Sequence, residues 1–143
     1  MSEETRLTPY VDWEGNTTAD AAAVLDDFRC PDDDTCWADE ASPDIPPQDV
    51  ALIVAWYRNE DYHGQAIVVY RDARDGKVYE NHGSHCSCYG LEGQWQPEEV
   101  STAEILQRPA YVPYHWGDYA VIGEINERIR ATLRTALLDS ANG

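Results

Sequence analysis

The residues best suited to chemistry gather in one stretch, from Asn81 to Trp95. This Asn81–Trp95 segment contains two histidines, two cysteines, three glycines, one glutamate and two large aromatic residues. A plain connector between two elements needs glycine and polar residues, but it does not need the succession His-Cys-Ser-Cys-Tyr. The residue types therefore indicate a site, and three kinds of site are compatible with them.

A structural zinc site is the first interpretation. Cys86 and Cys88 are two residues apart, so in an extended backbone both sulfurs lie on the same side. A complete ligand set would draw on the four cysteines Cys30, Cys36, Cys86 and Cys88, with His82 or His85 able to replace one of them. The Cys-x-Cys spacing is less specific than the Cys-x₂-Cys of zinc knuckles, and free cysteines also behave as small buried apolar residues. We therefore expect no cofactor, with zinc as the alternative.

Cysteine catalysis is the second interpretation. His85 precedes Cys86, and a thiolate–imidazole pair is a reactive combination. Neighbouring side chains on a strand point to opposite faces, however, and no protease or phosphatase signature is present. The sequence thus favours a protein that is not an enzyme and predicts no catalytic residue.

A ligand or partner pocket is the third interpretation. Gly83, Gly90 and Gly93 permit close approach of the backbone. The candidate ligand-binding residues offer hydrogen bonds or stacking faces, and they are Asn81, Ser84, His85, Tyr89, Glu92, Gln94 and Trp95. The structural alternative is a tightly folded loop whose polar groups satisfy one another.

The charge of the chain points to a partner rather than to a reaction. Ten basic residues stand against 27 acidic ones, a net charge of −17. Residues 1–50 hold 14 of the acids and two of the bases, a net charge of −12. A polyanion repels phosphate backbones, so we expect no direct binding to nucleic acid. The candidate partner-binding residues, which would meet a basic protein surface, are Asp26, Asp27, Asp32, Asp33, Asp34, Asp39 and Glu40. The alternative is that the charge only keeps the protein soluble.

The elements that position these residues are predicted to form one α+β domain over residues 1–143. Ala51–Tyr57 is β-branched and nearly continuously apolar, which is typical of a strand buried on both faces. Gly64–Asp72 and Lys77–Asn81 follow, the latter after the hairpin signal Asp75-Gly76. We expect an antiparallel meander of about three strands over residues 51–81.

Helices should flank this meander and pack on one of its faces. A short N-terminal helix is predicted over Ala19–Arg29, with an acidic, proline-rich loop after it. A second helix should start at Pro97-Glu98-Glu99 and end before Pro109. Asp118–Ser140 has apolar residues at helical spacing and is predicted to be an amphipathic C-terminal helix. No run is long enough to span a bilayer and no signal peptide is visible, so we expect a cytoplasmic protein with no membrane partner.

The run G-S-H-C-S-C-Y-G-L-E-G-Q-W, Gly83–Trp95, resembles a group of small uncharacterised proteins encoded by tailed bacteriophages and prophages. The resemblance covers roughly Asp61–Glu99 and does not extend to the acidic first 50 residues. It implies a viral origin and a place in the host cytoplasm, and it carries no catalytic residue because the group has no assigned activity.

The sequence and the resemblance together predict an acidic binding protein that inhibits or occupies a host protein. Nucleic-acid mimicry by its acidic residues would direct it to a nucleic-acid-handling or defence enzyme with a basic groove. The alternative is a small-ligand or zinc-binding module built on the Asn81–Trp95 segment, for example a nucleotide-binding counter-defence protein. The sequence carries no signal of oligomeric state.

Overall fold

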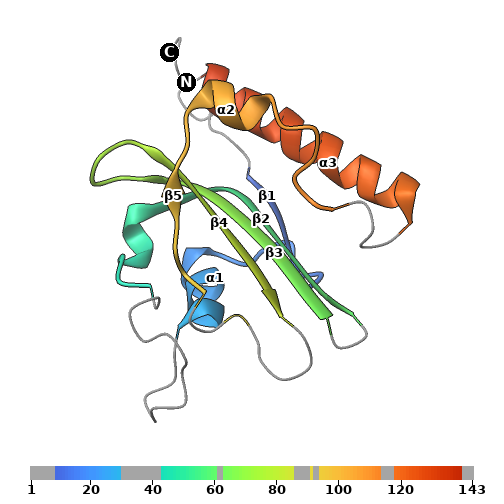
Figure 1. Ribbon diagram of the computed structural model, residues 1–143. Coiled ribbons are helices and arrows are strands. Elements are labelled where there is room, and N and C mark those ends of the chain that lie inside the picture. Colours follow the sequence, from blue (N-terminus) through green and yellow to red (C-terminus); the bar gives the residue numbers. More distant parts are fainter. Residues whose placement is uncertain are drawn as a thin grey trace.

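A five-stranded mixed sheet forms the centre of the protein in this computed structural model, which describes residues 9–29, 43–60, 63–85, 91, 94–113 and 118–139. The strands lie side by side in chain order (Figure 1): β1 Tyr10–Trp13, β2 Val50–Glu60, β3 His63–Asp72, β4 Val78–His85 and β5 Glu98–Glu99. β1 runs parallel to β2, whereas the other neighbouring pairs are antiparallel. The helices are α1 Ala21–Phe28, α2 Thr102–Leu106 and α3 Tyr119–Arg134, so the chain is an α+β protein.

The central strands form where the sequence predicts them. β2 is buried on both faces from Ile53 to Tyr57, as expected for an almost continuous apolar run. The hairpin between β3 and β4 turns at Asp75-Gly76, where Gly76 has a φ of +74° that a glycine adopts without steric strain. β4 then continues to His85, so the first residues of the Asn81–Trp95 segment belong to the sheet.

The predicted three-stranded antiparallel meander is wrong, because the sheet has two further strands and one parallel pair. β1 has only four residues, too few for an alternating pattern to identify it, and its partner on β2 is distant in the sequence. β5 has two residues, Glu98 and Glu99, and charged side chains are typical of a short exposed edge strand. The same two acids suit a first helical turn, which is why the sequence predicts a helix from Pro97.

That helix begins later, at Thr102. Ser101 caps α2 by accepting a hydrogen bond from the backbone N–H of Glu104 (3.1 Å), while the Glu104 carboxylate accepts one from the N–H of Ser101 (3.3 Å). This reciprocal capping box satisfies two backbone donors at the helix start. Ser101-Thr102-Ala103-Glu104 is therefore the signal that determines where α2 begins.

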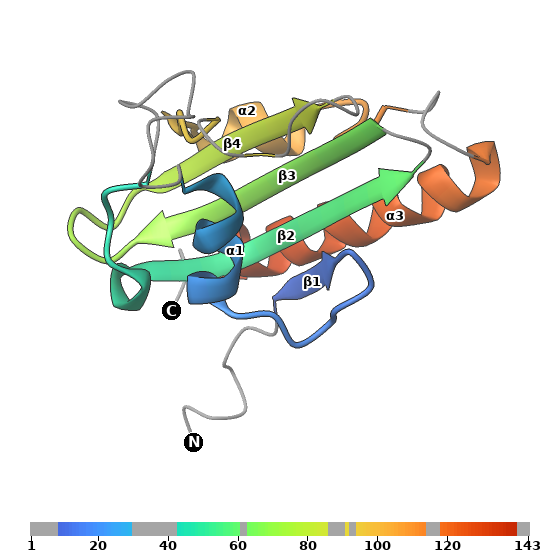
Figure 2. The same ribbon diagram turned by 90° about the horizontal axis from the view of Figure 1, so that it is seen from below.

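The helices cover both faces of the sheet, so the prediction that they share one face is also wrong. Figure 2 shows α1 in front of the sheet and α3 behind it. Val24, Leu25 and Phe28 of α1 pack with the side chains of β2 and β3 that point to their face. The buried apolar residues of α3 pack on the opposite face, and they are Ile122, Ile125, Ile129 and Leu133. In the described ranges, no helix is long and apolar enough to span a bilayer.

Candidate functional site

The Asn81–Trp95 segment is divided between β4 and a return path beside it, which leads to the edge strand β5. Asn81, Ser84 and His85 lie in β4, and Gln94 and Trp95 lie on the return path towards β5. The remaining predicted residues of this segment fall outside the described ranges: Cys86, Cys88, Tyr89 and Glu92. The same holds for Cys30, Cys36 and the acids Asp32, Asp33, Asp34, Asp39 and Glu40.

The alternation of β4 separates the two histidines. Asn81 and Gly83 lie opposite Val68 and Ala66, which face α1, so His85 faces α1 as well. His82 lies on the other face, where its ring contacts Glu80. The two imidazoles therefore cannot bind the same metal ion in this conformation. Within the part of the chain that the structure describes, no group of three or more His, Cys, Asp or Glu side chains could hold a metal ion.

His85 is built into the sheet surface. Its ring crosses β3 at Gly64, its register partner, and its Nε2 lies 2.7 Å from the hydroxyl of Tyr57 on β2. A Cβ atom at Gly64 would lie 1.9 Å from that nitrogen, so any larger residue at this position would displace the ring of His85. The contact joins three strands, which indicates a structural role for His85.

Trp95 is 5% exposed and packs inside the α1 layer. Its ring centroid lies 5.3 Å from that of Phe28 and 5.5 Å from that of Tyr70. Gly83 makes room for this packing, because a Cβ atom there would lie 2.8 Å from Leu91. The stacking face that the sequence offers to a ligand is thus used by the core.

Side-chain amides connect the outer edge of β4 to the return path. The N–H of Ser84 donates to Oε1 of Gln94 (2.9 Å), and the N–H of Gln96 donates to Oδ1 of Asn81 (2.7 Å). β5 pairs with β4 only at Tyr79 and Glu80. Beyond these residues, the side-chain amides supply the hydrogen bonds between β4 and the return path. They explain why Asn81, Gln94 and Gln96 occupy their positions.

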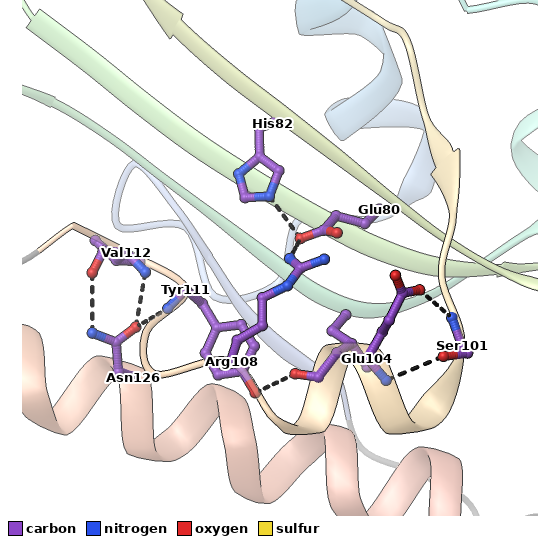
Figure 3. A network of polar contacts seen from close by, with 9 residues as sticks. Glu80, His82, Ser101, Glu104, Arg108, Tyr111, Val112 and Asn126 are labelled. Carbon is purple, nitrogen blue, oxygen red and sulfur yellow. Dashed lines mark hydrogen bonds and ion pairs between the residues drawn. The ribbon is translucent and has the colours of Figure 1, made fainter.

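A buried carboxylate lies at the same edge, on the face towards α2 (Figure 3). Oε2 of Glu80 accepts hydrogen bonds from Nε2 of His82 (2.6 Å) and from Nη1 of Arg108. The side chain of Glu80 is 7% exposed, whereas that of His82 is 45% exposed. Burial alone would raise the pKa of the Glu80 carboxyl, but the hydrogen bonds and charges of its two partners outweigh burial and lower the pKa to about 2. Glu80 is therefore an anion at neutral pH.

Arg108 is held in place by α3. The guanidinium of Arg130 donates to the backbone oxygen of Arg108 (2.5 Å) and lies over the ring of Tyr111. The amide of Asn126, which is 1% exposed, accepts from the N–H groups of Tyr111 (2.7 Å) and Val112 (2.8 Å) (Figure 3). Its Nδ2 donates to the oxygen of Val112 (3.1 Å). The segment that carries Arg108 is therefore fixed on α3, and Arg108 in turn is fixed on Glu80.

A polar cavity of about 390 Å³ opens between the edge of β4 and the return path. It is lined by Glu80, Asn81, His82, Gln94, Gln96 and Glu98. Two of these residues, Asn81 and Gln94, are ligand candidates predicted from the sequence, and His82 is a predicted alternative zinc ligand. The sequence does not single out Glu80, Gln96 and Glu98. Glu80 and His82 stand two apart on one strand, a spacing that places both on one face and could have identified the pair.

The two described acids among the predicted partner-binding residues lie on α1. Asp26 forms an exposed ion pair with Arg29 (3.6 Å), and Asp27 accepts a hydrogen bond from the indole of Trp13 (2.6 Å). Asp27 thus links α1 to β1 within the protein, whether or not it also contacts a partner protein.

Comparison of the chain with protein-family models, with curated proteins and with solved structures gives no match in any of the three. Its function is therefore inferred from the chain's own residues and geometry.

Proposed function

We propose that this chain is an acidic, phage-encoded binding protein that occupies a basic surface of a host protein. Enzymes that handle nucleic acid or act in defence fit this role, because their grooves are built to attract polyanions. The single observation that supports the proposal is the distribution of charged side chains around the sheet.

Several exposed acids lie on α1 and the loops next to it, and others lie on β5, α2 and α3. In the described ranges, Glu14, Asp20 and Asp44 are exposed and form no ion pair. Several cationic groups, in contrast, are engaged within the molecule. Arg74 pairs with Asp72, and Arg128 lies 4.6 Å above the ring of Tyr10 on the α3 side.

This arrangement leaves the negative potential of the α1 side largely uncompensated. Such a field speeds association with a basic partner and weakens as salt screens it. The alternative, in which the acidic residues only maintain solubility, predicts that neutralising acids on either side of the molecule has the same effect on capture of a partner.

The test compares two variants with the same change in net charge at different places. The first carries Glu14→Gln, Asp20→Asn, Asp26→Asn and Asp44→Asn, and asparagine at position 20 still caps α1. The control carries Glu99→Gln, Glu104→Gln, Glu124→Gln and Glu127→Gln on the other elements. We expect tagged wild type and control to capture the same host protein from a bacterial lysate, and the first variant to lose it.

The purified complex should also weaken when salt is raised from about 50 to about 500 mM, because the Debye length shortens several-fold. Equal capture by both variants, or an affinity that salt does not change, would show that the acidic side is not the interface.

Small-ligand binding is a second candidate function, and the observation that favours it is the cavity at the edge of β4. Its zinc form depends on cysteines outside the described residues and is tested by metal analysis of the purified protein with and without Cys86→Ala. Its nucleotide form is disfavoured, because the described residues of the cavity lining include two carboxylates and neither lysine nor arginine.

A further inference from the structure

The core on the α1 face of the sheet contains a continuous row of aromatic rings. The chain has five tryptophans and nine tyrosines but only one phenylalanine. Each ring of the row contacts the next, in the order Tyr79, Tyr70, Trp95, Phe28, Trp13 and Tyr57. Tryptophan and tyrosine give up an electron more readily than phenylalanine does, and rings in contact exchange electrons rapidly. The row therefore has the composition of a path for electrons.

The best aligned part of the row runs from Trp95 to Tyr79. The ring of Tyr70 lies between the other two, with its centroid 5.5 Å from that of Trp95 and 5.7 Å from that of Tyr79. The interplanar angles are 22° and 20°, so the three rings are stacked. An electron can therefore pass from Tyr79 to Trp95 through the ring of Tyr70.

The two tyrosines of the stack differ in the surroundings of the phenol proton. The hydroxyl of Tyr79 donates a hydrogen bond to Oδ2 of Asp75 (2.5 Å). This bond lowers the pKa of the Asp75 carboxyl, so Asp75 is an anion at neutral pH and can accept the proton. Burial, in contrast, raises the pKa of Tyr70, so that phenol keeps its proton. A tyrosine forms a lasting neutral radical only when its proton leaves with the electron, which places the end of the path at Tyr79.

Tyr79 also connects the core to the surface. Its side chain is half-buried on β4, and the hydrogen bond that joins it to Asp75 is exposed. Trp95, at the other end of the stack, is 5% exposed. A reductant in solution can thus contact the phenol oxygen of Tyr79 but has little access to the indole of Trp95.

We propose that the stack of Trp95, Tyr70 and Tyr79 carries oxidising equivalents from the core to the surface of the protein. A radical oxidant takes one electron from the indole of Trp95, whose N–H proton passes to water. An electron then moves from Tyr79 to Trp95, the phenol proton moves to Asp75, and the indole regains a proton from water. Asp75 releases its proton to water, and a reductant of the ascorbate class returns a hydrogen atom to Tyr79. This activity does not depend on the acidic side of α1.

The test is pulse radiolysis of the full chain with the azide radical, which at neutral pH oxidises tryptophan faster than tyrosine. We expect the absorption of the indolyl radical to give way to that of the tyrosyl radical, at a rate independent of protein concentration. Tyr79→Phe keeps the stacked ring and removes the hydroxyl, so this conversion should be lost. Tyr119→Phe is the control, because Tyr119 is 74% exposed on α3 and lies outside the row.

Two further variants test the proton acceptor and the first donor. Asp75→Asn should slow the conversion at least about ten-fold, because water takes the phenol proton less readily than a hydrogen-bonded carboxylate does. A nitroso spin trap and peptide mass spectrometry then locate the radical, and we expect most of the adduct at Tyr79 although Tyr119 is more exposed. Trp95→Phe keeps a ring in the stack and should reduce the adduct at Tyr79.

The proposal is overturned by a conversion that persists in Tyr79→Phe or keeps its rate in Asp75→Asn. Adducts distributed according to exposure, or an adduct at Tyr79 that is unchanged in Trp95→Phe, would overturn it as well. Far-ultraviolet circular dichroism of each variant checks that the fold is retained, and Tyr79→Phe alone decides the end of the path if Trp95→Phe does not fold.

Discussion

Neutralising the buried carboxylate of Glu80 should reduce the loss in the free energy of unfolding that occurs as the pH falls. The pKa of this group falls from 4.5 in the unfolded chain to about 2 in the fold. A lowered pKa means that the unfolded state takes up the proton first as the pH falls. The stabilisation is therefore complete above the unfolded pKa, and it is lost progressively as the pH falls towards 2.

The magnitude follows from the same two values. Between about pH 5.5 and about pH 3 the shift corresponds to a loss of about 2 kcal/mol in the free energy of unfolding. Other carboxylates add their own pH dependence, so the wild type must be compared with Glu80→Gln, which keeps the shape of the side chain and removes the titration.

Urea denaturation at a series of pH values measures this difference. We expect the wild type to exceed Glu80→Gln in stability at about pH 5.5, and the gap to narrow by about 2 kcal/mol by about pH 3. Glu124→Gln is the control, because Glu124 is exposed and forms no ion pair in the described ranges. A gap between wild type and Glu80→Gln that stays constant over this range would refute the assignment of Glu80 as an anion stabilised by the fold.

Three further predictions concern single contacts. Gly64→Ala should destabilise the protein by about 1–3 kcal/mol, since the new methyl group would displace the ring of His85. In a denaturation cycle the same change in a His85→Ala background should be nearly neutral, and equal losses in both backgrounds would exclude this contact as the cause. Asn126→Ala should cost about 2–4 kcal/mol by urea denaturation, because it leaves two N–H groups and one carbonyl on the loop without partners; a loss below about 1 kcal/mol would contradict that role. The pKa of Tyr79 is raised to about 12, most of all by its hydrogen bond to Asp75 and further by burial and nearby acids, so a spectrophotometric titration should give this phenol a higher pKa in the wild type than in Asp75→Asn. Subtracting the titration curve of Tyr79→Phe isolates the signal of this phenol. An unchanged Tyr79 pKa in Asp75→Asn would show that the carboxylate does not cause the shift.

The elements that sequence reasoning finds are those whose pattern is local. A short stretch of sequence is enough to identify each of three features: the apolar run of β2, the turn at Asp75-Gly76 and the helical spacing in α3. β1 is different, because a strand of four residues is stabilised by its neighbour rather than by its own pattern. The division of the helices between two faces likewise depends on how the connections cross the sheet.

The site was predictable only in part for the same reason. The Asn81–Trp95 segment contains three of the six described residues that line the cavity, and their polar types indicate a binding role. Arg108, which fixes Glu80, lies 28 residues further along the chain, and no spacing rule connects the two. The sequence also cannot show that Trp95 is used by the core, since an aromatic side chain serves a core and a ligand equally well.

The parallel pairing of β1 with β2 has a consequence for the order in which the protein assembles. Tyr10 pairs with Val54, so β1 leaves the ribosome before β2 and cannot complete its hydrogen bonds until β2 has been synthesised. The hairpins from β2 to β4 close through short connections, whereas joining β1 closes a long loop at a larger entropic cost. Nascent β2 and β3 can therefore associate first, after which β1 pairs with the free edge of β2 and α1 covers the exposed apolar face. Until that step the nascent chain presents unprotected apolar surface, the condition in which a chaperone would engage it.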